Sequence, residues 1–267
     1  MNNTITYMTA NDCARAVGWN MTEGWGQGEK ATREFFRPLP TYETRLDDYL
    51  NHIRAMGFNA IDLWLPVLDD AWATDEHIDI FNDVMQKTRL KVVGVAGWLG
   101  SSPEQFERIC EIASEVGATV LGGGTTMLTK DRPFVVDTLQ KYGLQLGIEN
   151  HPEKSPQELR DKIGDGGEGT LGACVDTGWF GTQGYNAAQA LEELADVLFH
   201  VHLKDVRETG KHDTCRFGQG VVPIQDCVDA LRRIQYTGAV VIEHEPEFFD
   251  PTEDIKASYA LLKEWMQ

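Results

Sequence analysis

The sequence predicts a single (β/α)8 TIM barrel, and two observations carry that prediction. The chain has 267 residues, which matches the usual length of one such barrel, about 250 residues. Short apolar runs rich in Val, Ile, Leu and Ala alternate with longer amphipathic segments along the whole chain, a pattern typical of parallel strands joined by helices. No linker or tandem repeat divides the sequence, so residues 1–267 are predicted to form one domain. A doubly wound open sheet is the alternative.

Eight apolar runs are the predicted strands. They are Ala16–Met21, Ala60–Leu65, Lys91–Ala96, Thr119–Gly122, Leu144–Ile148, Leu171–Val175, Leu198–Leu203 and Ala239–Ile242. Segments between these runs carry apolar residues at helical spacing. Examples of these predicted helices are Tyr42–Met56, Pro103–Val116, Pro133–Tyr142, Ala187–Leu194 and Gln225–Ile234.

Glycines support this assignment of alternating strands and helices. Gly57, Gly117, Gly143 and Gly238 each precede a predicted strand, at the position where a left-handed residue ends a helix. The segment Asn20–Pro40 is rich in glycine and aromatic residues and lacks periodicity. It is therefore predicted to be a long loop after the first strand, on the face that carries the active site of such barrels.

Composition limits the class of partner. The net charge of −18 and the pI near 4.7 disfavour binding to nucleic acid or to an anionic membrane, so a small polar molecule or a cation is expected. The five cysteines are scattered without a C-x-x-C pair, which favours reduced thiols over disulfides or a thiolate zinc site. The N-terminus has no signal-peptide pattern, and a cytoplasmic location is expected. A homo-oligomer and a hetero-oligomer are both compatible with the sequence.

Four predicted strands end with an ionisable residue. These residues are Glu149, Asp176, His202 and Glu243, and they follow one another at intervals of 27, 26 and 41 residues. Residues at the C-terminal ends of barrel strands carry the chemistry of this fold. We therefore expect the four side chains to line up around one half of the barrel mouth.

These four side chains predict a metal site. Any one of them alone could be an ordinary polar residue at a strand end, but three clustered anions are costly without a cation. The set predicts one divalent ion per chain, with Mn²⁺ favoured and Mg²⁺, Co²⁺, Fe²⁺ and Zn²⁺ as alternatives. Glu243 is preferred to Glu245 because it follows the apolar run directly, and His202 is preferred to His200, which lies one step deeper and suits a hydrogen-bonded core histidine.

Four motifs in the second half of the chain are specific. They are V-D-T-G-W-F at Val175–Phe180, H-V-H-L-K-D-V at His200–Val206, F-G-Q-G at Phe217–Gly220 and I-E-H-E at Ile242–Glu245. Together they resemble the sugar phosphate isomerase/epimerase superfamily of xylose-isomerase-like barrels, which includes ketose 3-epimerases and inosose-pathway enzymes. The resemblance is strong over about residues 140–247. It implies that the four strand-end residues are the metal ligands, and that Glu149 and Glu243 flank the substrate carbon.

The sequence departs from the family pattern at two positions. Trp179 stands where many members carry the histidine of D-x-x-H, and Gln219 stands where many carry the glutamate of G-E-G. The first departure removes a contact to substrate or to a second metal. Phosphodiester-cleaving members need additional histidines and aspartates for a multi-zinc cluster, so that activity is not expected.

Several further residues near strand ends have both a functional and a purely structural interpretation. His151 is a base, a substrate donor or a loop histidine, and Lys204 either holds a substrate oxygen or pairs with Asp205. Arg216, like Arg207 and Lys211, either contacts an anion or lies in a solvated loop. Trp98 and Trp179 either stack on a sugar or an aglycone or simply pack, as do Trp19, Trp25 and Trp64.

The resemblance and the ligand set predict a metal-dependent isomerase or epimerase of a ketose, keto-sugar or keto-cyclitol. The ion would bind the carbonyl oxygen and the neighbouring hydroxyl and stabilise an enediolate. One of Glu149 and Glu243 would remove the α-proton and the other would return it, with His151 as a substitute for either. The alternative is a lyase or dehydratase that eliminates a β-substituent from a 3-keto-glycoside or keto-cyclitol. A non-enzymatic sugar-binding or assembly subunit is the third interpretation.

Overall fold

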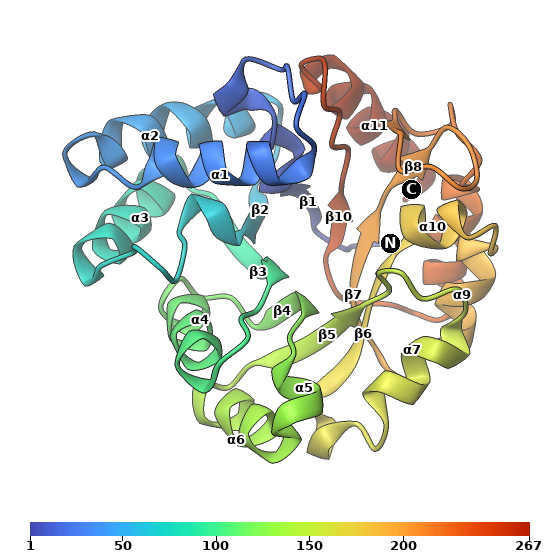
Figure 1. Cartoon of the computed structure of the whole chain (residues 1–267). Coiled ribbons are helices and arrows are strands. Elements are labelled where there is room, and N and C mark those ends of the chain that lie inside the picture. Colours follow the sequence, from blue (N-terminus) through green and yellow to red (C-terminus); the bar gives the residue numbers. More distant parts are fainter.

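The computed structural model describes residues 1–267 and contains a closed barrel of parallel strands. Figure 1 shows the strands at the centre and the helices around them. The order around the barrel is β1, β10, β7, β6, β5, β4, β3 and β2. The strands are β1 (Ile5–Met8), β2 (Ala60–Trp64), β3 (Lys91–Trp98), β4 (Val120–Gly124), β5 (Gln145–Glu149), β6 (Leu171–Asp176), β7 (Leu198–Leu203) and β10 (Val240–Ile242). The predicted (β/α)8 fold is confirmed.

Helices cover the outside of the barrel and bury their apolar stripes against it. The α-helices are α1 (Trp25–Phe36), α2 (Leu39–Ala55), α3 (Asp75–Thr88), α4 (Pro103–Glu115), α5 (Met127–Lys130), α6 (Arg132–Tyr142), α7 (Pro156–Ile163), α8 (Thr177–Thr182), α9 (Ala187–Glu193), α10 (Ile224–Arg233) and α11 (Thr252–Trp265). Short 3₁₀ turns are η1 (Thr9–Asp12), η2 (Arg15–Val17), η3 (Leu65–Val67) and η4 (Gly167–Gly169). No helix is both long enough and apolar enough to cross a membrane.

The strand register brings the ends of β6, β7 and β10 to one level. His202 on β7 is paired with Asp176 on β6 and with Val241 on β10. Beyond β7 the chain forms a small antiparallel pair, β8 (Asp205–Val206) with β9 (Thr214–Cys215). This pair leaves the segment between β8 and β9 on the same face as the strand ends.

The first strand lies earlier than predicted, and the predicted strand Ala16–Met21 is wrong. Gly18 and Trp19 have left-handed φ values of 65° and 59°, which an extended strand does not contain. They end the η2 turn instead. The true strand β1 pairs with β10 and β2, and its run of four residues is too short to stand out in the sequence.

The loop predicted over Asn20–Pro40 is also wrong, because it contains helix α1. The buried face of α1 consists of Gly28, Thr32 and Phe36. A Cβ on Gly28 would lie 2.5 Å from the carbonyl oxygen of Cys13, so the helix approaches the chain closely through a small residue. Because Gly28 and Thr32 occupy the inner face in place of large apolar residues, the sequence shows no clear helical periodicity here.

The glycines before the strands follow the prediction at three of the four turns. Gly57, Gly117 and Gly143 have φ values of 101°, 80° and 66°. Gly238 has no left-handed conformation; after α10 that role falls to Gln235, with φ of 57°, so this part of the prediction is wrong. All five cysteines are free and buried, as expected.

Candidate metal centre

The four predicted ligands lie together at the C-terminal ends of their strands. Ligand atoms of Glu149, Asp176, His202 and Glu243 all lie within 4.8 Å of one another. Nδ1 of His202 is 3.1 Å from Oε1 of Glu149 and 3.1 Å from Oε2 of Glu243. The side chain of Glu149 is 20 % exposed, whereas that of His202 is 1 % exposed. The cluster is therefore buried on three sides and opens toward solvent at Glu149.

Side-chain hydrogen bonds hold the strand ends after the regular ladder stops. Nδ2 of Asn150 donates to the carbonyl oxygen of Asp176 at 2.9 Å, and the amide of Asp176 donates to Oδ1 of Asn150 at 2.8 Å. Asn11 makes the same kind of link to β10: its amide donates to the carbonyl of Ile242 and its oxygen accepts from the amide of His244. Each asparagine thus fixes the backbone next to a candidate ligand.

The two oxygens of Asp176 have different surroundings. Oδ1 accepts from the amides of Gly178 and Trp179 at 2.7 and 3.1 Å and so caps helix α8. Oδ2 faces the centre of the cluster, 2.8 Å from Nζ of Lys204. Burial raises the pKa of Asp176 to about 6, since it outweighs the attraction of Lys204. One oxygen therefore positions the side chain and the other is directed at the site.

Lys204 supplies the positive charge of the cluster. Its side chain is 2 % exposed, and Nζ lies 2.8 to 3.0 Å from Asp176, Glu243 and Glu245. Burial lowers the pKa of Lys204, but the three carboxylates outweigh burial and the pKa lies well above its ordinary value. The ammonium pairs with these carboxylates rather than with Asp205, which accepts instead from the amides of Gly218, Gly220 and Val222.

The donor set fits a hard divalent cation. Oδ2 of Asp176 and Oε2 of Glu243 are buried and have no hydrogen bond of good geometry, although Nζ of Lys204 lies 2.8 Å from the first and Nδ1 of His202 lies 3.1 Å from the second. Buried carboxylate oxygens of this kind are costly without a cation. Three carboxylates and one imidazole nitrogen match the oxygen-rich coordination of Mn²⁺ or Mg²⁺. Glu149, Asp176, His202 and Glu243 are therefore the residues that could hold the ion.

Aromatic rings cover one side of this cluster. The ring of Trp179 stacks on His151 at 3.9 Å and on His212 at 4.4 Å. The indole thus stacks on two imidazoles, and the stacking of Trp179 on a sugar stays a prediction. Nε2 of His212 lies 3.3 Å from Nζ of Lys204. The imidazole of His151, by contrast, makes no hydrogen bond to the four candidate ligands.

Two predicted substrate contacts, Trp98 and Arg216, have hydrogen-bond partners other than the candidate ligands. Trp98 is 56 % exposed, and its indole donates to Ser101 at 3.2 Å. With the amide of Gln219 oriented so that its oxygen faces the guanidinium, Arg216 donates to that oxygen within its own loop. No hydrogen bond or ion pair joins either residue to the candidate ligands.

Sequence reasoning missed three residues that surround the cluster. Oδ2 of Asp62 on β2 lies 3.1 Å from Nε2 of His202. Glu245 pairs with Lys204, and His212 lies in the segment between β8 and β9. An aspartate inside the apolar run of β2 was an available signal for Asp62, because a charged residue is unusual in a buried strand. Glu245 was set aside in favour of Glu243, and nothing in the sequence distinguishes His212 from a solvated loop residue.

Residues 50–265 match the family described as xylose isomerase-like TIM barrel. The chain belongs to this family. Its sequence is similar to a D-psicose 3-epimerase of Enterocloster bolteae, at 24 % identity over 73 % of this chain and 75 % of that protein. It is also similar to an inosose dehydratase of Lactiplantibacillus plantarum, at 24 % identity over 60 % of this chain and 69 % of that protein.

Solved structures of other proteins share the fold. A 3-keto-D-glucoside 4-epimerase from E. coli superposes with a TM-score of 0.63 at 22 % identity, over 82 % of this chain and 94 % of that chain. At this identity the similarity establishes the barrel fold but does not identify the substrate or the reaction of this chain.

Proposed function

We propose that this member of the xylose isomerase-like family is a divalent-metal-dependent isomerase or epimerase of a ketose, keto-sugar or keto-cyclitol. The observation that carries the proposal is the placement of Glu149 and Glu243. Each lies 3.1 Å from Nδ1 of His202, and they come from strands that are separated by β6 and β7 in the barrel. Two carboxylates that approach one point from different strands can transfer protons on the two opposite faces of a substrate carbon.

The protein residues divide the proton transfers between them. One glutamate removes the proton next to the substrate carbonyl, and the other delivers a proton to the opposite face. A bound divalent ion would supply the Lewis acid that stabilises the developing enediolate charge. Lys204 would donate to a substrate oxygen only by releasing one of its partners, because its three N–H groups face Asp176, Glu243 and Glu245. His151 is the candidate to replace one glutamate as acid or base.

The relatives support the substrate class. The names of the D-psicose 3-epimerase and the 3-keto-D-glucoside 4-epimerase both describe epimerisation of a sugar that carries a ketone. Proton transfer next to a carbonyl is the chemistry that the paired glutamates suit. A small sugar or cyclitol is therefore the proposed ligand of this chain.

A second candidate function is a lyase or dehydratase reaction through the same type of intermediate. A leaving group at the β-carbon needs a proton, and Lys204, Glu245 and His212 form a separate polar group beside the candidate ligands. The similarity to an inosose dehydratase agrees with this option. The two reactions differ in their products and not in the residues that remove the first proton.

Metal content tests the first part of the proposal. Purified protein should carry about one divalent ion per chain by elemental analysis, lose activity to EDTA and recover best with Mn²⁺ or Co²⁺. A His202→Ala variant should bind the ion more weakly. Full metal affinity in that variant, or no specific site in the wild type, would contradict the assignment.

Solvent exchange tests the chemistry. D-Fructose, D-psicose and a 3-keto-glucoside incubated with the enzyme in D₂O should gain deuterium at the carbon next to the carbonyl, as measured by NMR. Glu149→Gln and Glu243→Gln should each slow exchange about 10²-fold or more, with metal content checked in parallel. Glu192→Gln is the control, because Glu192 pairs with Arg233 on the surface. Turnover without solvent deuterium would remove the roles given to these glutamates, and release of a β-substituent would establish the lyase reaction.

A further inference from the structure

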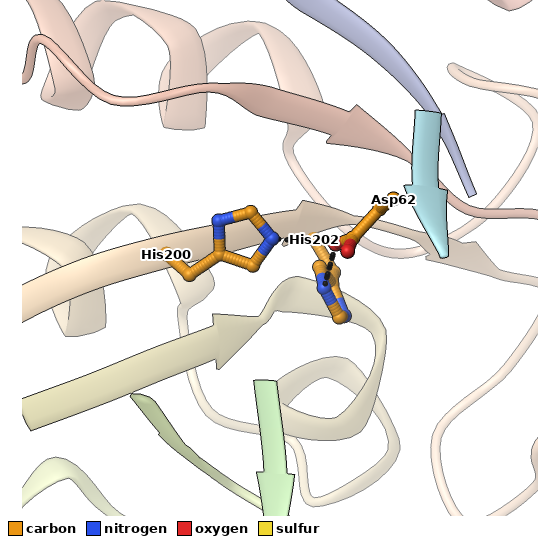
Figure 2. Close-up of side chains that lie close together, drawn as sticks. All are labelled: Asp62, His200 and His202. Carbon is orange, nitrogen blue, oxygen red and sulfur yellow. Dashed lines mark hydrogen bonds and ion pairs between the residues drawn. The ribbon is translucent and has the colours of Figure 1, made fainter. Parts of the chain in front are cut away.

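Asp62 is a buried carboxylate that the four candidate ligands do not include. It lies on β2 with 0 % exposure, and its Oδ2 is 2.5 Å from Nε2 of His200 and 3.1 Å from Nε2 of His202. Figure 2 shows Asp62 extending from β2 toward both imidazoles of β7. The carboxylate therefore contacts the second nitrogen of a candidate metal ligand.

The two nitrogens of His202 point in opposite directions. Nδ1 faces Glu149 and Glu243, whereas Nε2 faces Asp62. A neutral imidazole has one N–H donor and one lone pair, and a carboxylate only accepts hydrogen bonds. Contact with Asp62 therefore holds the proton on Nε2 and leaves the lone pair of Nδ1 directed at the other ligands, as metal binding requires.

The barrel interior is shaped to accommodate this carboxylate. A Cβ on Gly94 of β3 would lie 2.8 Å from Oδ1 of Asp62. On β4, a Cβ on Gly122 would lie 3.5 Å from the ring of His200 and 3.6 Å from the ring of His202. Bulky branched apolar residues normally fill such a barrel. The carboxylate of Asp62 therefore needs glycine at position 94, whereas at Gly122 a Cβ would be in ordinary van der Waals contact with both imidazoles and only a larger side chain would displace them.

We propose that Asp62 is a positioning residue of the metal centre, which fixes the tautomer and the ring orientation of His202. His200 donates to the same oxygen and holds the carboxylate from its other side. This inference rests on the proposed metal-binding function. A separate ion bound by Asp62, His200 and His202 is disfavoured, because Oδ2 of Asp62 and Nε2 of His200 are in direct hydrogen-bond contact at 2.5 Å, with no space for an ion between them.

The test compares Mn²⁺ binding by the wild type and by Asp62→Asn, with calorimetry for affinity and elemental analysis for stoichiometry. Loss of an outer partner of a metal-bound histidine typically weakens binding about 10- to 100-fold, and this loss is expected for Asp62→Asn. Asp12→Asn is the matched control. Asp12 is also buried and accepts from the hydroxyl of Tyr7 at 2.7 Å, but it has no contact with His202, so its variant should keep wild-type affinity.

A spectroscopic measurement separates positioning from a general loss of stability. In Zn²⁺-loaded wild type, ¹⁵N NMR of the histidine rings should show His202 protonated at Nε2 and bound through Nδ1. The opposite assignment would overturn the inference without use of any variant.

The other outcomes distinguish this inference from the proposed function. Equal affinity in the wild type and Asp62→Asn, or equal losses in Asp62→Asn and Asp12→Asn, would overturn the positioning role alone. Two ions per wild-type chain, with one lost in Asp62→Asn, would replace it by a second metal site. A wild type that binds no divalent ion would overturn the proposed function and the inference together.

Discussion

Lys204 affects both the stability of the protein and the charge of the candidate metal site. Its ammonium group lies among Asp176, Glu243 and Glu245, and all four side chains are buried. An ammonium group has only three N–H donors, and His212 is a fourth neighbour at 3.3 Å. Lys204 thus neutralises part of the charge that a divalent ion would otherwise neutralise alone, so protein stability and metal affinity are linked through it.

Lys204→Met should destabilise the metal-free protein by about 3–5 kcal/mol, because it leaves buried carboxylates without their cation. Mn²⁺ should raise the free energy of unfolding more in this variant than in the wild type, since the ion replaces the missing positive charge. Urea unfolding with and without Mn²⁺ measures both effects.

Lys87→Met is the control for that measurement. Lys87 pairs with Asp47 at 2.9 Å, but its side chain is 63 % exposed, and an exposed pair contributes only about 0–1 kcal/mol. Equal losses of stability in the two variants, or a smaller effect of Mn²⁺ on Lys204→Met than on the wild type, would contradict the role given to Lys204.

At the scale of elements, the strand ends depend on polar side chains that bind backbone groups. Asn150 makes two hydrogen bonds to the backbone of Asp176, and the hydroxyl of Thr177 makes two to the backbone of Lys204. These contacts link β5 to β6 and β6 to β7 beyond the last paired residues of the regular ladder. The candidate ligands are thereby held on rigid backbone rather than on mobile loops.

Asn150→Ala should lower both stability and metal affinity. It leaves the buried amide of Asp176 without its partner, at a cost of about 1–3 kcal/mol, and removes one hydrogen bond to the carbonyl of Asp176. The backbone that carries Asp176 should also become less fixed, so calorimetry should find weaker Mn²⁺ binding.

Asn3→Ala is the matched control, because Asn3 donates to the carbonyls of Tyr236 and Gly238 and contacts none of the candidate ligands. It should lose stability and keep its metal affinity. Unchanged affinity in Asn150→Ala would show that Asp176 does not need this link.

Most strands could be predicted from the sequence, and the two segments that were predicted wrongly share a cause. Runs such as Lys91–Ala96 stood out because Val and Ala continue through them. β1 has only four residues, and α1 buries Gly28 and Thr32 in place of large apolar residues. Periodicity detects elements through large apolar side chains, so elements that pack through short runs or small residues escaped it.

At the scale of the molecule, closure of the barrel determines which parts of the site could be predicted from the sequence. Glu149, Asp176 and His202 lie on strands that are consecutive in the chain and adjacent in the barrel, so counting strands brought them together. Asp62 meets His202 across 140 positions of sequence. That contact depends on the way side chains fill the interior, which strand order alone does not specify.

Buried thiols give the whole molecule a predictable pH dependence. Burial raises the pKa of Cys110 and of Cys215 to about 12, and it raises the pKa of Cys227 above its ordinary value. An unfolded thiol has a pKa of about 8.5. The unfolded chain therefore releases these protons at a lower pH than the folded protein does.

Stability should consequently fall as pH rises from about 8.5 toward 12. The contribution of each thiol is fully present below the unfolded pKa, and in that interval it is lost at up to about 1.4 kcal/mol per pH unit. Urea unfolding of the metal-free protein at a series of pH values measures the slope. Cys110→Ala should be less stable below about pH 8.5 because of the small cavity. Above that pH its slope should be shallower by the share of one proton, so its stability should approach that of the wild type as pH rises. A slope that is the same with and without Cys110 would mean that this thiol ionises as readily in the folded protein as in the unfolded chain.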